Sequence, residues 1–218
     1  MTRLPQLLAF LLVIATQTGV ASAQKISVRT LFIGPERPPA TLHMRGEEKD
    51  LGELKIATQQ IGDAQALPAR RFVLGRLESA QFTPLAEVEL PEAGKHFILL
   101  LFPRQNGYHV ETIRSDDPAF RPASVRFFNL TQRRIGLELG SVRDALAPGE
   151  NKLIQLRKNP DAPFIQTRFY SEKNGRPVLF SNSRWPVSER LRHLIFIYQS
   201  PEHTQPRYHA VSDLAPQP

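Results

Sequence analysis

Short runs of alternating apolar and polar residues recur along the chain between residues 26 and 211. In LAEVEL (85–90) the apolar side chains of Ala86, Val88 and Leu90 fall on one face, and two glutamates fall on the other. That period of two is typical of a β-strand with one buried face. Turn residues, many of them proline, separate the runs at roughly regular spacing. The pattern therefore predicts an all-β protein.

Fourteen runs of this kind predict strands. Two of them, HFILLLF (96–102) and RHLIFIY (192–198), are apolar on both faces, so we expect them to be central strands of their sheets. The segment closest to a helical pattern, WPVSERLRHL from Trp185, allows two turns at most. The predicted strands cover residues 26–33, 40–45, 53–57, 70–76, 85–90, 96–102, 108–114, 124–130, 135–139, 152–156, 164–171, 176–182, 192–198 and 207–211.

The chain contains an internal repeat with an offset of 97 residues. The tripeptide Ser-Val-Arg at 27–29 recurs at 124–126, and an ungapped comparison at this offset gives 15 identities in 93 pairs. Average residue usage would give about six per hundred. Gly52 and Gly149 also coincide, and we expect each to adopt a positive φ in a turn before a strand. The repeat indicates that one β-module was duplicated.

Each copy has the size and the strand number of an immunoglobulin-like sandwich. We therefore predict two tandem immunoglobulin-like β-sandwiches, with domain 1 at residues 24–117, domain 2 at residues 121–214 and a short proline-bounded linker between them. Two sandwiches joined so closely are expected to leave a groove between them. The alternative is one larger β-sandwich whose strands share a composition.

The N-terminus has the pattern of a secretory signal peptide over residues 1–23. Arg3 precedes the nine-residue apolar run LLAFLLVIA (7–15), and the small residues at 21–23 form an A-x-A cleavage site. Since a bilayer span needs about 20 apolar residues, we expect export rather than a membrane-spanning anchor. The chain has no cysteine, so we expect core burial rather than disulfides to hold the fold. The expected location is the periplasm or the extracellular space.

Charge is distributed unevenly between the two predicted domains. Residues 24–120 contain 12 Lys and Arg against 13 Asp and Glu, whereas residues 121–218 contain 15 against 8. A cationic domain favours anionic partners, and the planar guanidinium group of Arg suits carboxylates and phosphates. We therefore expect a non-catalytic module whose basic domain 2 binds an envelope polyanion or a protein partner. The candidate binding residues are Arg133, Arg134, Arg184, Trp185, Arg190 and Arg192.

Trp185 is the only tryptophan of the chain and stands between Arg184 and Pro186. An exposed Trp beside arginines could stack on a sugar ring or help to hold an anionic glycan. The alternative, which we favour, is a core Trp that closes one end of the second sandwich. Because the Arg-rich strands lack interleaved aromatic residues, we do not expect nucleic-acid binding.

The sequence contains no motif that indicates catalysis. G-x-S-x-G, P-loop and H-E-x-x-H patterns are all missing, so we do not expect an enzyme or a cofactor. A hydrolase would need a concave pocket with two convergent carboxylates or a His–Ser pair. His96 and His193 fall at matched positions of the repeat, where the predicted central strands begin, and a duplicated histidine there is expected to be structural.

Histidines near the C-terminus raise the question of a metal site. His203 and His209 lie six residues apart, with Glu202 and Asp213 nearby. Imidazole and carboxylate groups together can bind Zn²⁺. Loop histidines near an exposed chain end are usually only solvated, so we expect no metal.

Segments such as SVRFFNLTQRRIGLELG (124–140) and RHLIFIY (192–198) resemble those of uncharacterised exported β-sandwich proteins of environmental Gram-negative bacteria. No established activity comes with that resemblance. In architecture the chain is similar to two-domain periplasmic pilus chaperones, which have an export signal, a similar size, two immunoglobulin-like domains and a basic cleft. This analogy implies an alternative function, a chaperone or assembly factor that acts by β-strand augmentation.

Overall fold

The computed structural model describes residues 26–47, 49–157, 164–200 and 202–214, which form strands, turns and loops. Sixteen strands in this part of the chain make four four-stranded sheets, so the all-β prediction is confirmed. The described residues include no helix with the length and hydropathy needed to cross a membrane. The predicted signal peptide at residues 1–23 lies outside the described residues.

The first half of the chain forms two sheets, with the strand orders β4-β1-β7-β8 and β3-β2-β5-β6. The bounds of its strands are β1 (Ile26–Phe32), β2 (Thr41–Arg45), β3 (Asp50–Lys55), β4 (Gln65–Leu67), β5 (Arg71–Glu78), β6 (Gln81–Glu89), β7 (His96–Arg104) and β8 (Gly107–Arg114).

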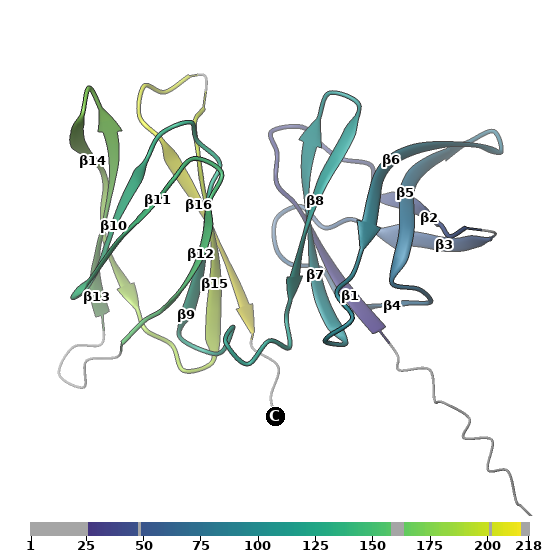
Figure 1. Ribbon diagram of the computed structural model, residues 1–218, viewed down its shortest axis with the longest axis horizontal. Helices are drawn as coiled ribbons and strands as arrows, with labels where there is room; N and C mark the ends of the chain where they lie inside the picture. The colour runs from purple at the N-terminus through teal and green to yellow at the C-terminus, as the bar shows by residue number, and fades with distance from the viewer. Residues whose placement is uncertain (1–25, 48, 158–163, 201, 215–218) are drawn as a thin grey trace, which may run out of the picture.

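The second half repeats this arrangement strand for strand, with the orders β12-β9-β15-β16 and β11-β10-β13-β14 (Figure 1). Each strand of the first half therefore has a counterpart eight strands later in the chain. The bounds in the second half are β9 (Ser124–Asn129), β10 (Ile135–Leu139), β11 (Val142–Leu146), β12 (Asn151–Gln155), β13 (Phe164–Lys173), β14 (Arg176–Pro186), β15 (Leu191–Tyr198) and β16 (Arg207–Leu214).

The constant offset of the sequence repeat holds at the ends of each half and fails in the middle. The β7–β8 and β15–β16 hairpins pair in equivalent register at that offset. Gly52, however, lies inside β3, whereas Gly149 lies in the turn before β12, the counterpart of β4. Both glycines have the expected positive φ, 90° and 74°, but they are not equivalent positions. The reason is that the connections between corresponding strands differ in length.

A parallel pair distinguishes each half from the immunoglobulin strand order. In a constant-type immunoglobulin domain the first, second, fifth and fourth strands form one sheet. Here β1 lies between β4 and β7 and runs parallel to β7, and β9 runs parallel to β15 in the same way. A parallel pair needs a long crossover connection, which the strands between β1 and β7 provide. The immunoglobulin-like order is thus not confirmed, while two similar eight-stranded halves are present.

Each half has its own core between its two sheets. In the first half, Val28 of β1 and Leu99 of β7 pack against residues of the facing sheet such as Leu74 of β5, and all three are fully buried. The second core is built in the same way around Phe127 and Phe169. The alternation of apolar and polar residues along the strands provides these cores, since every second side chain points inward.

A third apolar cluster joins the two halves. The inner sheets β4-β1-β7-β8 and β12-β9-β15-β16 face each other (Figure 1). Between them, Ile98 and Leu100 of β7 pack with Leu194 and Phe196 of β15 and with Phe120 of the linker, and none is more than 1% exposed. Both faces of β7 and β15 are therefore covered, which confirms the prediction of two central strands. Apolar side chains fill most of the space where a groove was expected.

Candidate functional site

The structure separates the predicted binding residues instead of bringing them together. The segment 133–134 precedes β10, and its Arg134 carbonyl accepts a 3.1 Å hydrogen bond from the N–H of Glu172, near the end of β13. Arg184 pairs with Gln166, near the start of β13. Arg190 comes just after β14 ends, and Arg184 lies near that same end of the strand. The arginines at 133–134 and those at 184 and 190 thus lie at opposite ends of the outer sheet.

Trp185 packs against the second core. Its ring centroid lies 5.5 Å from that of Phe169, 6.1 Å from that of Tyr208 and 6.5 Å from that of Phe127. The side chain is half-buried. This placement agrees with the favoured interpretation of a Trp that closes one end of the core.

Arg192 lies in the interior of the protein, 1% exposed. Its Nε donates to Asp213 Oδ2 at 2.8 Å, and its Nη1 donates to the carbonyl oxygens of Ser115 at 2.7 Å and Phe120 at 2.5 Å. The guanidinium carbon also lies 4.1 Å from the centroid of the Phe120 ring. Burial lowers the pKa of Arg192, and the charge of Asp213 opposes that shift. Because Arg192 is enclosed and bonded within the protein, we remove it from the candidate binding surface.

Asp213 also binds an arginine from the other half of the chain. Arg29 Nη1 donates to Asp213 Oδ1 at 2.5 Å, and Nη2 donates to Oδ2 at 3.0 Å. This two-bond geometry is the strong form of an Arg–carboxylate contact. One buried carboxylate therefore joins Arg29 of β1 to Arg192 of β15. We call these three residues the junction cluster.

The valine and the arginine of the repeated Ser-Val-Arg tripeptide have similar positions in the two halves. Val28 and Val125 are fully buried, one in each core. The arginine that follows each valine points to the opposite face of the inner sheet, because successive side chains alternate. Arg29 joins the junction cluster there, and the guanidinium carbon of Arg126 lies 5.6 Å from the centroid of Phe120. The tripeptide thus provides one core residue and one junction residue to each half.

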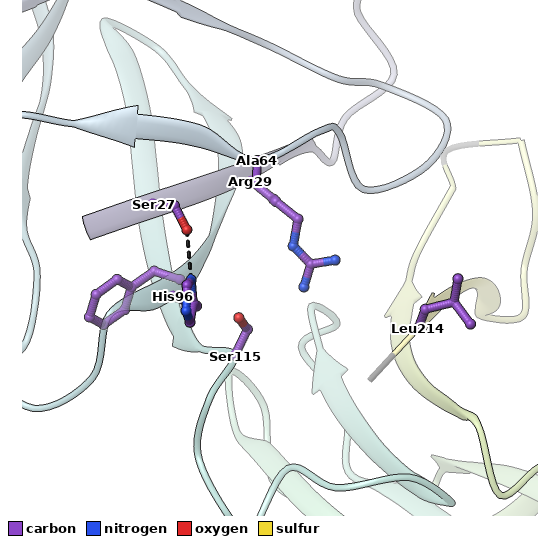
Figure 2. A pocket seen from close by; sticks show the side chains of 7 residues that line it. Ser27, Arg29, Ala64, His96, Ser115 and Leu214 are labelled. Carbon is purple, nitrogen blue, oxygen red and sulfur yellow. Dashed lines mark hydrogen bonds between the residues drawn. The ribbon is translucent and has the colours of Figure 1, made fainter. Parts of the chain in front are cut away.

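A cavity of about 210 Å³ opens beside the junction cluster (Figure 2). Ser27 Oγ lies 2.8 Å from His96 Nδ1 on its wall, and Arg29 extends into the space between Ser115 and Leu214. The cavity brings together groups that can donate hydrogen bonds: a guanidinium, two hydroxyls and an imidazole. Its lining residues are Ser27, Arg29, Ala64, His96, Phe97, Ser115 and Leu214.

A His–Ser pair in a cavity is the feature that we expected of a hydrolase. A nucleophilic serine needs a base that is in turn oriented by a third group, and no carboxylate hydrogen-bonds to His96 among the described contacts. A second pair, with Ser212 Oγ 3.1 Å from His193 Nδ1, occurs in the other half. Burial lowers the pKa of His193. The two pairs use different serines of the repeat, because the counterpart of Ser212 in the first half is Ser115 and not Ser27.

Exposed cations collect on the outer sheet of the second half. Glu138 of β10 stands between Arg143 of β11 and Arg168 of β13, with Arg–Glu distances of 3.5 Å and 3.3 Å. Arg184 lies on the same face of the sheet, because it pairs with Gln166, which is two residues before Arg168 in β13. A hydrogen bond from Tyr170, together with the two arginines, lowers the pKa of Glu138. We call Arg143, Arg168 and Arg184 the cationic face.

The matching face of the first half is balanced in charge. Arg71 and Glu89 form an ion pair at 2.5 Å, and His43 Nε2 lies 3.5 Å from Glu53. By strand register, this face carries the cations Arg45, Lys55 and Arg71 and the carboxylates Glu53, Glu87 and Glu89. The sequence shows the excess charge in the second half, but the candidate binding residues chosen from it included neither Arg143 nor Arg168.

Comparison with models of known protein families finds no match, and neither does comparison with curated protein sequences. In the part of the chain that the structure describes, no three His, Asp or Glu side chains are grouped so that they could hold a metal ion. His203, which we considered as a zinc ligand, instead has its Nε2 2.7 Å from Arg207 Nη1.

Proposed function

We propose that the protein is an exported, non-catalytic binding module that recognises an anionic polymer of the cell envelope through the cationic face of its second half. The observation that carries the proposal is the exposure of three arginines on one face of a rigid sheet. The Arg143 side chain is 83% exposed and the Arg168 side chain is 46% exposed. Glu138 neutralises part of this charge and also holds two of the guanidinium groups in place.

The spacing of this face suits a chain of repeated negative charges. Neighbouring strands of a sheet lie about 4.8 Å apart, so Arg143 and Arg168, with β10 between them, present positive charge at roughly twice that interval. Arg guanidinium groups can contact carboxylates or phosphates with two hydrogen bonds each. Near the hairpin end of the sheet, Glu172 lies on the same face as Arg168, because the two are four residues apart along β13.

Binding of polygalacturonate, a carboxylated polysaccharide, tests this proposal by isothermal titration calorimetry. We expect binding at about 50 mM NaCl and its loss near 500 mM, because salt screens exposed charges. The triple variant Arg143→Gln, Arg168→Gln, Arg184→Gln should weaken binding about tenfold or more, since exposed ion pairs contribute up to about 1 kcal/mol each.

The first half provides a matched control with the same change in net charge. In the variant Arg45→Gln, Lys55→Gln, Arg71→Gln, three cations are removed from the equivalent face, and binding should stay within about twofold of the parent protein. Equal losses in the two triple variants would mean that net charge alone attracts the polymer, and the proposal would then be wrong.

Strand addition to a client, the alternative function, has less support. The long free edge of β14 contains Pro177 and Pro186, and the register shift opposite Phe169 and Tyr170 leaves Phe180 as a bulge. Prolines and bulges are features that protect sheet edges from pairing with other chains. The pilus-chaperone analogy therefore extends to the two-unit architecture, and the edge of β14 does not favour strand addition.

We also propose that the two halves descend from one duplicated β-module of about immunoglobulin size. Identical strand orders and the shared parallel pair support a common origin. The secretory pattern at residues 1–23 supports export. Cleavage before Gln24, detected by N-terminal sequencing of the protein recovered from the periplasm, is the direct test of that location.

A further inference from the structure

The junction cluster contains two cations and one carboxylate. Arg192 is buried, and its guanidinium also donates to the Ser115 and Phe120 carbonyl oxygens. Arg29 uses two of its five N–H groups for Asp213. Its side chain is 22% exposed, compared with 1% for that of Arg192. The surplus positive charge therefore lies on Arg29, at the wall of the cavity.

The nearest further carboxylate is already engaged. Asp116 Oδ1 accepts a 2.9 Å hydrogen bond from Arg114 Nε, and Asp116 Oδ2 accepts a 2.7 Å hydrogen bond from the Lys95 N–H. These contacts lower the pKa of Asp116 against the effect of burial. Asp116 is thus bonded to Arg114, although its charge also opposes the lowering of the Arg192 pKa by burial. A buried or half-buried charge without a full counter-charge favours an anion from solution.

Other donors converge on the same cavity from different elements. The Ser27 hydroxyl comes from β1, the His96 imidazole from the start of β7, and the Ser115 hydroxyl from the segment after β8. Figure 2 shows the Ser115 hydroxyl and the Arg29 guanidinium facing the same space, with the Ser27–His96 pair beside them. Ser115 is 2% exposed and lies on the inner wall of the cavity.

The second half lacks this arrangement although its sequence contains the corresponding residues. Ser124, the counterpart of Ser27, is buried and donates to the Arg121 carbonyl at 2.6 Å. Ser212, the counterpart of Ser115, bonds to His193 instead. The donors around Arg29 are therefore arranged differently from their counterparts in the second half.

We infer that this cavity binds a phosphate-type oxyanion, either inorganic phosphate or the terminal phosphate of a monoester. Donors that approach from several directions suit a tetrahedral anion with three or four acceptor oxygens better than a planar carboxylate with two. The cavity, at about 210 Å³, leaves room for a substituent on the phosphate. This site lies at the junction of the halves and is independent of the cationic face.

Calorimetric titration of the full chain with inorganic phosphate, glycerol 3-phosphate and acetate tests the inference. We expect both phosphates to bind with a dissociation constant in the range of about 1 mM or tighter, and acetate to bind at least about tenfold more weakly. Tighter binding of glycerol 3-phosphate than of inorganic phosphate would identify a monoester as the preferred source. Equal affinity of the two phosphates would support the site and would show that free phosphate is a sufficient ligand.

Ser115→Ala is the informative variant, and Ser212→Ala is its matched control. Loss of a hydrogen bond to a charged ligand should weaken phosphate binding about tenfold in Ser115→Ala, with no change in Ser212→Ala. His96→Gln gives a second, exposed position if Ser115→Ala does not fold, as judged by near-ultraviolet circular dichroism. No binding of either phosphate at about 10 mM, equal binding of acetate, or equal effects of the two serine variants would overturn the inference.

Discussion

At the scale of single residues, Asp213 joins the two halves through its carboxylate. It is 3% exposed and binds one arginine from each half, across sequence separations of 184 and 21 residues. Its counterpart at the sequence offset, Asp116, lies at a turn and is bonded to Arg114. The same residue type therefore has different roles in the two halves, because Arg192 lies opposite Asp213 in the β15–β16 hairpin, where the first half has Lys95, and Arg29 reaches Asp213 across the junction.

Removal of the Asp213 carboxylate should destabilise the protein strongly. Asp213→Ala leaves two cations at the junction without their partner, and breaking one side of a buried ion pair costs about 3–5 kcal/mol. The exposed pair of Arg71 and Glu89 provides the control, because Glu89→Ala should cost less than about 1 kcal/mol. Urea denaturation measures both values. Similar free energies of unfolding for the two variants would show that the junction cluster contributes little.

At the scale of elements, each half has a β-bulge in its outer sheet, but the connection near the bulge differs between the halves. A register shift in the β5–β6 pair leaves Leu85 as the extra residue, and a shift in the corresponding β13–β14 pair leaves Phe180 as the extra residue. Both side chains pack against their cores. In the first half a short turn leads into β8, and Gly107 lies against the backbone of Leu85. In the second half a longer loop connects β15 to β16.

Gly107→Ala should disrupt this corner of the first half. Gly107 has φ of 142°, and a Cβ atom there would lie 2.1 Å from the Leu85 carbonyl oxygen. Backbone strain and overlap together should cost about 3 kcal/mol or more. Gly175, with φ of 73° and open space around it, is the matched control.

Gly175→Ala should lower the free energy of unfolding by only about 1–2 kcal/mol, because alanine is less stable than glycine in a left-handed conformation. The free energies of unfolding in urea give the comparison. If the two substitutions had the same effect, the close approach of β8 to β6 would not be the reason why glycine is needed at position 107.

Two edge strands, β4 and β11, were not predicted from the periodicity of the sequence. β4 has three residues, and β11 (VRDAL) has a charged centre, so neither contains enough alternation to be recognised. The other fourteen strands were predicted to within a few residues, because each buries one or both faces in a regular order. Edge strands are paired on one side only and are short, so their sequences carry less of the pattern.

At the scale of the whole molecule, the third apolar cluster and the junction cluster make the two halves one structural unit. Leu100 and Phe196, one from each inner sheet, are fully buried in the contact between the halves. A half separated from its partner would expose these side chains to water. Such apolar contacts between domains favour cooperative unfolding.

We expect a single unfolding transition for the whole chain. Trp185, the only tryptophan, reports on the second half by fluorescence, and far-ultraviolet circular dichroism reports on the strands of both halves. The two probes should give the same midpoint in urea. Phe196→Ala should lower both midpoints together, at a cost of about 3–5 kcal/mol. Separate midpoints in the parent protein would mean that the halves unfold independently.

The sequence by itself determined the all-β class, the faces of the strands, the central position of β7 and β15 and the existence of two similar halves. These properties follow from local alternation and from comparison of the chain with itself. Only the tertiary structure decided the sheet order, the burial of Arg192 and the grouping of Arg143 with Arg168. Each depends on contacts between residues far apart in sequence, such as the 184 residues between Arg29 and Asp213. A count of charges cannot distinguish an arginine that faces solvent from one that joins two halves, because the distinction lies in the partner that folding supplies.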